Sequence, residues 1–254
     1  MADLFRLSAV SAFSDNYIWV LHDPSRAIAV DPGDAAPLLA FLDARQLSLD
    51  AVWITHHHAD HIGGLPQLAS RFSGLPVYGP AGVNGVSRPV SDGDTLTAFG
   101  STVQVLAVPG HTANHLAYLA GQHLFCGDTL FGAGCGRVFD GSLSQLFHSL
   151  QRLAALPPDT LCYPAHEYTL SNLTFAAAVE PGNGAIHARR ASDSARREQG
   201  LPTVPTTLAT ELDSNPFLRT AVPEVGRSAS RHAGQNLTAG EDIFATLRSW
   251  KNQF

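Results

Sequence analysis

The run Thr-His-His-His-Ala-Asp-His at positions 55–61 constrains this chain more than any other segment. An apolar stretch that ends in Val52, Trp53 and Ile54 comes directly before it and is typical of a buried strand. Imidazole and carboxylate groups at this spacing are ligands that zinc, iron and manganese accept. A purification tag would lie at a terminus and would contain no aspartate. The segment therefore predicts a metal-binding loop at the carboxyl end of a strand.

Size and composition predict a folded protein with a real core. The chain has 254 residues and a mass of 27.0 kDa, which fits one large domain or one domain with a small appendage. Hydrophobic residues make up 44% and charged residues 15%, so disorder is not expected. The formal net charge of −6 argues against a nucleic acid as the partner, because such binding needs a basic face.

Several features predict a cytoplasmic protein that does not cross a membrane. Residues 1–13 lack the basic segment and apolar core of a secretory signal, and no run of about 18 apolar residues occurs. Cys126, Cys135 and Cys162 form no paired spacing, which favours a reducing compartment without disulfides. We expect a monomer.

The hydrophobic pattern predicts sheets covered by helices, a layered α/β arrangement. A hairpin is expected around residues 23–25, and Asp34 is expected to cap the helix that follows. Composition changes near residues 180–182, which predicts a first domain over residues 1–170 and a small, mostly helical domain over residues 171–254. The expected strands cover 18–21, 27–30, 49–54, 77–78, 96–99, 103–108, 116–119, 124–126 and 160–163; the expected helices cover the segment after Asp34, 65–72, 143–153, the segment after Thr169, 187–199 and 241–252.

Three further segments place a possible metal ligand just after a strand. His111, Asp128 and His166 each follow an apolar run, at the strand ends where open α/β folds place their binding sites. Taken singly, each is more typical of a turn or capping residue. His57 stands between ligand candidates and is expected to point away from them. His115 could support a metal ligand from behind or be needed only for the fold, and the sequence does not decide between these roles.

Together these segments supply seven ligands: His56, His58, Asp60, His61, His111, Asp128 and His166. Seven are too many for one tetrahedral ion and suit two ions that share a carboxylate. A structural zinc site would more typically use cysteines. The set therefore predicts a binuclear hydrolytic centre, in which Asp128 is shared and a water or hydroxide between the ions is the nucleophile.

These motifs resemble the metallo-β-lactamase superfamily and, within it, the glyoxalase II (hydroxyacylglutathione hydrolase) family. The superfamily resemblance rests on residues 56–61, 109–112, 127–129 and 165–167. The family resemblance rests on residues 13–19, 30–34, 127–131, 134–137, 166–169, 180–183 and 215–219, and on Arg248 and Lys251. The family resemblance covers nearly the whole chain. The Gly-Cys-Gly-Arg segment and the C-terminal part make the resemblance specific to this family within the superfamily.

The resemblance implies an αββα sandwich with a small C-terminal helical domain that helps to bind glutathione. By matching position, His56, His58 and His111 would hold one metal ion, Asp60, His61 and His166 the other, and Asp128 would bridge them. Asp60 and Asp128 are thereby the catalytic carboxylates. Two divalent transition-metal ions are implied, with zinc as the first expectation and iron or manganese as alternatives, because all three accept these ligands.

The resemblance also implies which residues bind the substrate: Arg137, Phe139, Tyr168, Arg248 and Lys251. Arg248 and Lys251 lie three apart on one helix face, and two cations suit a tripeptide carboxylate. Without the family, the same pair would predict an ordinary solvated helix end. Phe139 stands where some relatives have a tyrosine, so a substrate hydrogen bond is expected to be absent there. Cys135 has no basic partner in its motif and is expected to be a small buried residue.

The resulting prediction is a thioester hydrolase that converts S-(2-hydroxyacyl)glutathione, with S-D-lactoylglutathione as the expected substrate, into the hydroxy acid and glutathione. This is the second step of methylglyoxal detoxification in the family. Other enzymes on the same scaffold stay open, namely a β-lactamase, a lactonase, a persulfide dioxygenase or an RNA-processing nuclease. A non-catalytic metal-binding regulator is a further alternative, but it would require a broken ligand set, and all seven ligand positions are intact.

Overall fold

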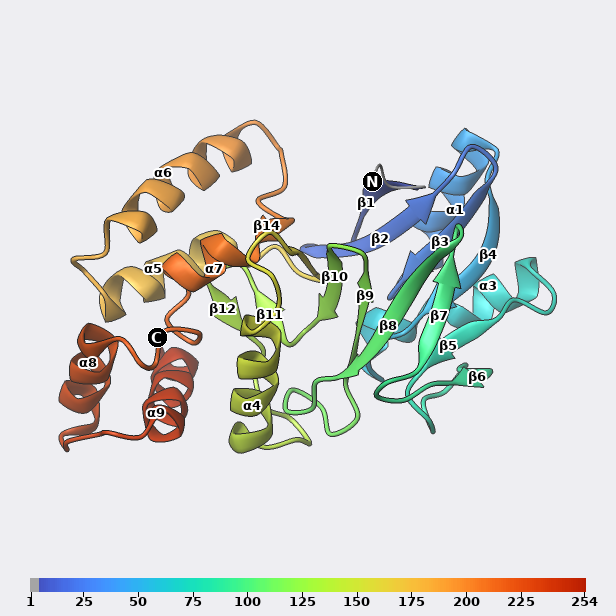
Figure 1. Ribbon diagram of the computed structural model, residues 1–254. Coiled ribbons are helices and arrows are strands. Elements are labelled where there is room, and N and C mark those ends of the chain that lie inside the picture. The colour runs from blue at the N-terminus through green and yellow to red at the C-terminus, as the bar shows by residue number, and fades with distance from the viewer. Residues whose placement is uncertain (1–4) are drawn as a thin grey trace. The chain divides into compact units, whose positions relative to one another are not determined.

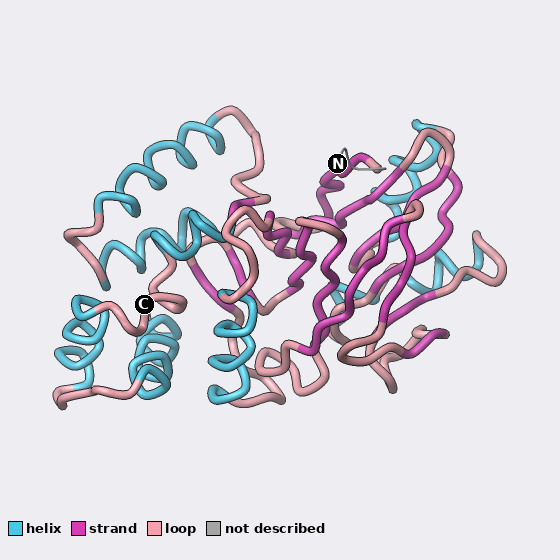
Figure 2. Tube along the Cα trace, in the orientation of Figure 1, coloured by secondary structure: helices cyan, strands magenta, loops and turns pink. Residues whose placement is uncertain are grey.

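The computed structural model describes residues 5–254, which form two compact units (Figures 1 and 2). The first unit comprises the chain up to Ala107 together with Asn114–Gly127; the second comprises Val108–Ala113 and Asp128–Phe254. The first four residues of the segment predicted to lack a secretory signal lie outside the described residues. The units do not divide at residue 170, so a domain boundary there stays a prediction. Within residues 5–254, every helix is too short or too polar to span a bilayer.

The first unit contains ten strands and three helices among its described residues. They are β1 (Arg6–Ala12), β2 (Asn16–His22), β3 (Arg26–Val30), α1 (Ala35–Arg45), β4 (Ser48–Trp53), α2 (Ala59–Ile62), α3 (Leu65–Arg71), β5 (Val77–Gly79), β6 (Arg88–Pro89), β7 (Thr95–Ala98), β8 (Ser101–Ala107), β9 (Leu116–Ala120) and β10 (His123–Gly127).

One sheet of this unit has the order β1-β2-β3-β4-β5-β6. Strands β1, β2 and β3 are antiparallel, and β3 to β6 run parallel to one another. The predicted hairpin is confirmed as β2 and β3, in the register that pairs Trp19 with Val30. Strand β1 was not predicted; its alternating side chains are mostly polar or partly exposed. Parallel neighbours β3 and β4 end at the same edge of the sheet, which brings Asp31 next to the 55–61 loop.

Helices α1 and α3 cover one face of this sheet. Asp34 caps α1 as predicted, because its Oδ1 accepts a hydrogen bond of 2.9 Å from the Ala36 amide. Leu38 and Leu42 on α1, and Leu68 on α3, are buried against the sheet in one hydrophobic cluster. Burial of apolar surface stabilises the folded state by roughly 25 cal/mol per Å², so the contacts of these helices stabilise the sheet.

The second sheet of this unit is the antiparallel ladder β10-β9-β8-β7. Its aromatic side chains pack against β4: the Tyr118 ring stacks on Trp53 with centroids 5.3 Å apart, and Phe125 contacts Trp53 edge-on at 6.0 Å. The Tyr118 hydroxyl also donates a 2.7 Å hydrogen bond to the Ile54 carbonyl. Two packed sheets with helices outside confirm the predicted layered arrangement, and these contacts fix the end of β4, where the 55–61 loop begins.

The second unit is mostly helical after residue 165, as predicted for the C-terminal part (Figure 2). Ser142 caps α4 by accepting from the Gln145 amide, and Leu146, Leu150 and Leu153 form its buried face. Helices α7 and α8 were not predicted, since α7 is short and α8 carries few apolar residues. The elements are β11 (Leu130–Phe131), β12 (Gly134–Cys135), α4 (Leu143–Ala154), β13 (Leu161–Pro164), α5 (Thr169–Val179), α6 (Gly184–Glu198), β14 (Thr206–Thr207), α7 (Leu208–Ser214), α8 (Pro223–Ala233) and α9 (Gly240–Gln253).

Candidate metal centre

In the first unit, Asp31 holds both ends of the 55–61 loop. Its carboxylate accepts hydrogen bonds from the Thr55 amide at 2.8 Å and the Thr55 hydroxyl at 2.7 Å. The same carboxylate lies 3.0 Å from His61 Nδ1. Asp31 is buried and has a φ of 51°, a left-handed conformation that orients its side chain toward the loop. Sequence reasoning placed Asp31 only in a turn and missed this role, although its position after β3, beside β4, was the available signal.

The side chains of His56 and His58 converge. His56 Nε2 and His58 Nδ1 are 3.0 Å apart, and the Thr55 hydroxyl lies 3.0 Å from His56 Nδ1. The buried ring of His115 stacks on His56, with centroids 4.7 Å apart and an interplanar angle of 19°. His57 is exposed, which agrees with the prediction that it points away from the ligands. His115 therefore packs directly behind a predicted ligand, a role that the sequence left open.

Asp60 and His61 lie on the short helix α2. His61 Nε2 is 3.5 Å from Asp60 Oδ2, and the same oxygen accepts a 3.0 Å hydrogen bond from Asn16 Nδ2. The hydrogen bond with His61 and that from Asn16 hold the pKa of Asp60 well below its usual range. The carboxylate is thus ready to act as an anionic ligand. Gly33 permits this arrangement, because a Cβ there would lie 1.7 Å from the Asp60 carbonyl oxygen.

In the second unit, the carboxylate of Asp128 faces two histidines. Asp128 Oδ2 lies 3.4 Å from His111 Nε2, and Asp128 Oδ1 lies 3.3 Å from His166 Nε2. His111 Nδ1 donates a 2.7 Å hydrogen bond to the Arg137 carbonyl, which leaves Nε2 available for a metal. All three residues are buried. One carboxylate with an oxygen directed at each of two histidines is the geometry expected of a bridging ligand.

The Gly-Cys-Gly-Arg segment lies against this group. A Cβ at Gly136 would lie 2.0 Å from the Asp128 carbonyl oxygen and 3.0 Å from His111 Nδ1. Only glycine allows the backbone to approach so closely. Cys135 is buried, as predicted, and burial raises the pKa of its thiol, which argues against a nucleophilic role.

Arg248 is buried, with 4% of its surface exposed, so the expectation of an ordinary solvated helix end is wrong for this residue. Its Nη1 donates to the Cys135 carbonyl at 2.9 Å and to the Gly136 carbonyl at 3.4 Å, and its guanidinium lies over the Phe217 ring. Arg248 therefore anchors the segment whose next carbonyl, that of Arg137, orients His111. Its predicted contact with substrate stays a prediction.

Lys251, Arg248 and Arg137 carry positive charge close together. Burial lowers the pKa of Lys251, and the charges of Arg248 and Arg137 lower it further. The Lys251 ammonium lies 5.5 Å from the Phe175 ring centroid and 3.5 Å from the Ser171 carbonyl oxygen. Cations from two segments that are distant in sequence thus influence one another, and together they favour an anionic ligand; their contact with glutathione stays a prediction.

Phe139 and Tyr168 flank the two histidines of this unit. The Phe139 side chain is 65% exposed and its ring meets His111 edge-on, with centroids 5.2 Å apart. The Tyr168 ring is stacked on His166 at 4.9 Å and 3°. Two aromatic faces beside predicted metal ligands can shield a substrate from water and hold its apolar part.

The donor set fits transition metals in both units. Each unit holds a cluster of histidine and aspartate side chains with ligand atoms 3.0 to 3.5 Å apart. His61 Nδ1 lies beside the Asp31 carboxylate, and His111 Nδ1 donates a hydrogen bond to the Arg137 carbonyl; metal-binding histidines typically have such a partner at the ring nitrogen that does not bind the metal. These clusters can bind metal ions; which ions they bind is not determined by ligand type.

Comparison with known proteins gives two family matches. Residues 13–83 and 75–166 match the metallo-beta-lactamase superfamily, and residues 167–254 match the hydroxyacylglutathione hydrolase C-terminus. A hydroxyacylglutathione hydrolase from Dechloromonas aromatica is 51% identical over 266 residues, covering 99% of this chain and 100% of the relative. One from Nitrosomonas eutropha is 46% identical over 258 residues, covering 100% of both chains.

Solved structures support the same fold. ETHE1 from Myxococcus xanthus is 28% identical, with a TM-score of 0.66 and coverage of 97% of this chain and 90% of that one. TTHA1623, solved in a di-iron-bound form, is 26% identical, with a TM-score of 0.59 and coverage of 84% of this chain and 100% of that one. The second of these proteins binds two metal ions on a related scaffold.

Proposed function

Because this chain belongs to the hydroxyacylglutathione hydrolase family of the metallo-beta-lactamase superfamily, we propose that its seven histidine and aspartate ligands hold two metal ions that serve thioester hydrolysis. It is a metal-dependent hydrolase that cleaves S-(2-hydroxyacyl)glutathione into a hydroxy acid and glutathione. The predicted αββα fold of the superfamily is confirmed by these matches. The observation that carries the metal proposal is Asp128, whose two carboxylate oxygens face different histidines.

In this proposal His56, His58 and His111 hold one ion, and Asp60, His61 and His166 hold the other, with Asp128 as ligand to both. Two divalent ions bound there supply Lewis acidity, which lowers the pKa of a water and polarises the thioester carbonyl. Asp31 fixes the His61 ring, and the Arg137 carbonyl fixes His111. A thiolate leaves readily, so the chain needs no strong general acid. Zinc is the proposed metal, with iron or manganese as alternatives.

We further propose that the cationic group Arg137, Arg248 and Lys251 attracts the carboxylates of glutathione, with Lys251 as the residue in contact. Phe139 and Tyr168 would line the position of the acyl group and the thioester beside His111 and His166. S-D-lactoylglutathione is the proposed substrate. A persulfide dioxygenase is the second candidate, but the full-length similarity to hydroxyacylglutathione hydrolases does not favour it.

Metal analysis and a paired activity assay test this proposal. We expect gently purified protein to contain about two transition-metal ions per chain, and S-D-lactoylglutathione to be converted to D-lactate and glutathione. Removal of metal with a chelator should abolish hydrolysis, and added metal should restore it. Asp128→Glu should retain more metal and activity than Asp128→Ala. Oxygen consumption with glutathione persulfide, in a protein holding a single iron, would instead support the dioxygenase, and a metal-free protein with full hydrolase activity would exclude the metal centre.

A further inference from the structure

The second unit contains a cavity that none of the proposed metal or substrate residues lines. Its volume is about 670 Å³, within the range of small-molecule sites. Helix α8, the start of α9, the turns before them and part of α4 form its walls. Phe147 and Ile243 give it an apolar side, whereas Arg227 and Arg231 give it a charged one.

Two glycines keep this cavity open. Gly226 lies inside α8, where glycine costs a helix about 1 kcal/mol relative to alanine. A Cβ there would meet only the tip of Ile243, at 3.4 Å, so packing does not require a glycine. A Cβ at Gly240 would lie 3.2 Å from the Thr220 hydroxyl and 3.4 Å from the Phe147 ring. Side chains at either position would occupy space in the cavity.

No carboxylate in the cavity lining balances the positive charge of its arginines. Arg227 and Arg231 are four residues apart on α8, so their side chains project from the same helix face. Both are exposed, and neither forms an ion pair with a carboxylate in the described residues. The cavity lining contains no aspartate or glutamate. A guanidinium group can bind a phosphate or a carboxylate through two parallel hydrogen bonds.

Thr220 also lines the cavity, and the residue is only 6% exposed. Its hydroxyl can donate or accept a hydrogen bond, so it offers a polar group to a ligand in the cavity. The loop that closes this side is fixed, because the Leu237 amide donates a 3.0 Å hydrogen bond to Ser230 Oγ.

We propose that this cavity is a binding site for a small organic anion with a phosphate or carboxylate group. Arg227 and Arg231 would bind the anionic group, the Thr220 hydroxyl would bond to a polar atom of the same ligand, and Phe147 and Ile243 would contact its carbon skeleton. The site is separate from thioester hydrolysis and does not depend on it.

Amide-resolved NMR titration of the full-length, metal-loaded protein tests the proposal. Inorganic phosphate and acetate are the two probes, with sodium chloride at matched ionic strength as the reference. We expect saturable shifts confined to the segments that line the cavity, residues 147–151, 220–231 and 236–243. Tighter binding of phosphate would identify a phosphate ligand, and tighter binding of acetate a carboxylate ligand. Absence of saturable shifts with both probes would overturn the proposal.

Variants distinguish specific binding in the cavity from general electrostatic attraction of anions to the protein surface. Arg227→Ala combined with Arg231→Ala should weaken binding about tenfold or more, as expected for loss of charge-assisted hydrogen bonds. Arg88→Ala combined with Arg190→Ala removes the same charge from exposed positions outside the cavity and should leave the affinity unchanged. Gly226→Val should weaken binding by filling the cavity; circular dichroism verifies that α8 persists. Equal losses in both double variants would show surface charge attraction only, and would contradict the proposal.

Discussion

Arg248 and Lys251 look equivalent in sequence, but the structure gives them different surroundings. Arg248 is buried and bonded to the carbonyls of Cys135 and Gly136, whereas Lys251 is half-buried and bonded to one distant carbonyl. The segment that Arg248 anchors continues to the Arg137 carbonyl, which accepts the hydrogen bond from His111. Loss of the Arg248 guanidinium would leave two buried carbonyls without this donor. Removal of the Arg248 guanidinium is therefore expected to disturb His111, a proposed metal ligand, and not only the binding of substrate.

The two residues should accordingly respond differently to removal. Lys251→Ala should raise KM for S-D-lactoylglutathione about tenfold, with kcat and metal content nearly unchanged, because it loses a contact to a non-reacting part of the substrate. Arg248→Ala should also lower metal content and thermal stability, with a loss of about 1–3 kcal/mol from unsatisfied buried carbonyls.

Steady-state kinetics, metal analysis and thermal unfolding of both variants would measure this difference. Arg190→Ala, at an exposed position of α6, is the control for loss of one positive charge. Unchanged metal content in Arg248→Ala, with a raised KM alone, would mean that Arg248 acts on substrate directly and not through His111.

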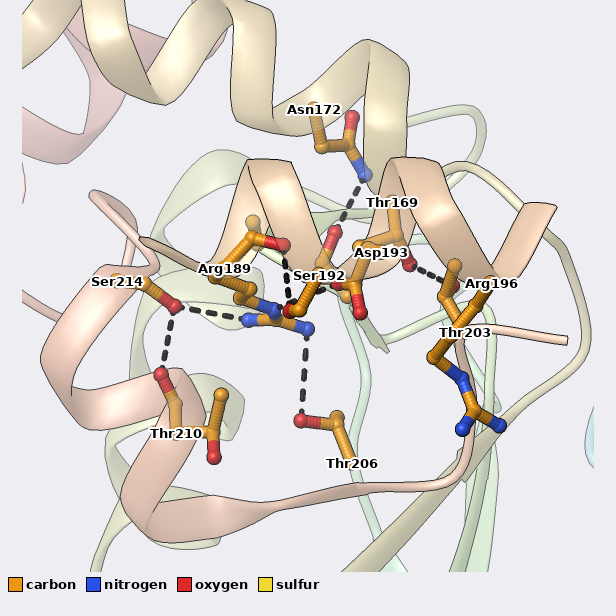
Figure 3. Close-up of polar contacts among 12 residues, drawn as sticks. Thr169, Asn172, Arg189, Ser192, Asp193, Arg196, Thr203, Thr206, Thr210 and Ser214 are labelled. Atoms are coloured by element: carbon orange, nitrogen blue, oxygen red, sulfur yellow. Dashed lines mark hydrogen bonds and ion pairs between the residues drawn. The ribbon is translucent and has the colours of Figure 1, made fainter. Parts of the chain in front are cut away.

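At the scale of elements, a buried ionic group ties α6 to α7 and to the β11–β12 hairpin. Arg189 on α6 lies 2.7 Å from Glu211 on α7. Arg189 also donates a 2.8 Å hydrogen bond to Ser214 (Figure 3). Glu211 also accepts from the Ala133 amide in the hairpin turn, at 2.8 Å. Although burial opposes it, the charge of Glu211 raises the pKa of Arg189, which therefore stays charged. The hairpin supports the Gly-Cys-Gly-Arg segment, so this group holds part of the site in place.

Breaking this group should destabilise the fold strongly. Arg189→Ala leaves Glu211 as a buried charge without its guanidinium, which costs about 3–5 kcal/mol of unfolding free energy. Replacing both, as Arg189→Met with Glu211→Leu, should cost less than Arg189→Ala alone, because the fully buried charge of Glu211 is removed together with its partner.

Urea-induced unfolding of Arg189→Ala and of the Arg189→Met, Glu211→Leu double variant measures these free energies of unfolding. Arg190→Ala is again the matched control, since it is the next residue on the same helix and is exposed; its expected change is within about 0.5 kcal/mol. If Arg189→Ala proves as stable as this control, Arg189 and Glu211 do not form a structural ion pair.

At the scale of the whole molecule, the proposed ligands come from both compact units, four from the first and three from the second. Metal ions that bind only the folded chain stabilise it by mass action, by about 2.7 kcal/mol when free metal is a hundred times its dissociation constant. We therefore expect the metal-loaded protein to unfold at a clearly higher temperature than the chelated protein. Asp128→Ala should abolish most of this difference.

Differential scanning calorimetry of loaded and metal-free protein, with the exposed His57→Ala variant as control, measures the effect. The control should show the same rise in melting temperature as the original chain. An identical melting temperature with and without metal would contradict binding by these residues.

Local patterns in the sequence determined much of the fold and the chemical type of the site. The β2–β3 hairpin, the Asp34 cap of α1 and the buried leucines of α4 depend on neighbours within a few residues, so turn chemistry and periodicity predict them. The ligand-type residues were recognisable because each follows an apolar strand. Elements with weak patterns were missed, among them the short α7, the mostly polar α8 and the partly exposed β1.

Only the tertiary structure decided how those residues are supported. Asp31 lies 24 residues from Thr55, His115 stacks on a ring 59 positions away in sequence, and Arg248 reaches carbonyls 112 and 113 residues away. No local propensity encodes such pairings, because they arise when strands align and helices pack. The same reason explains the cavity beside α8: the mid-helix Gly226 is visible in sequence, but the space that it opens is created by residues from three helices.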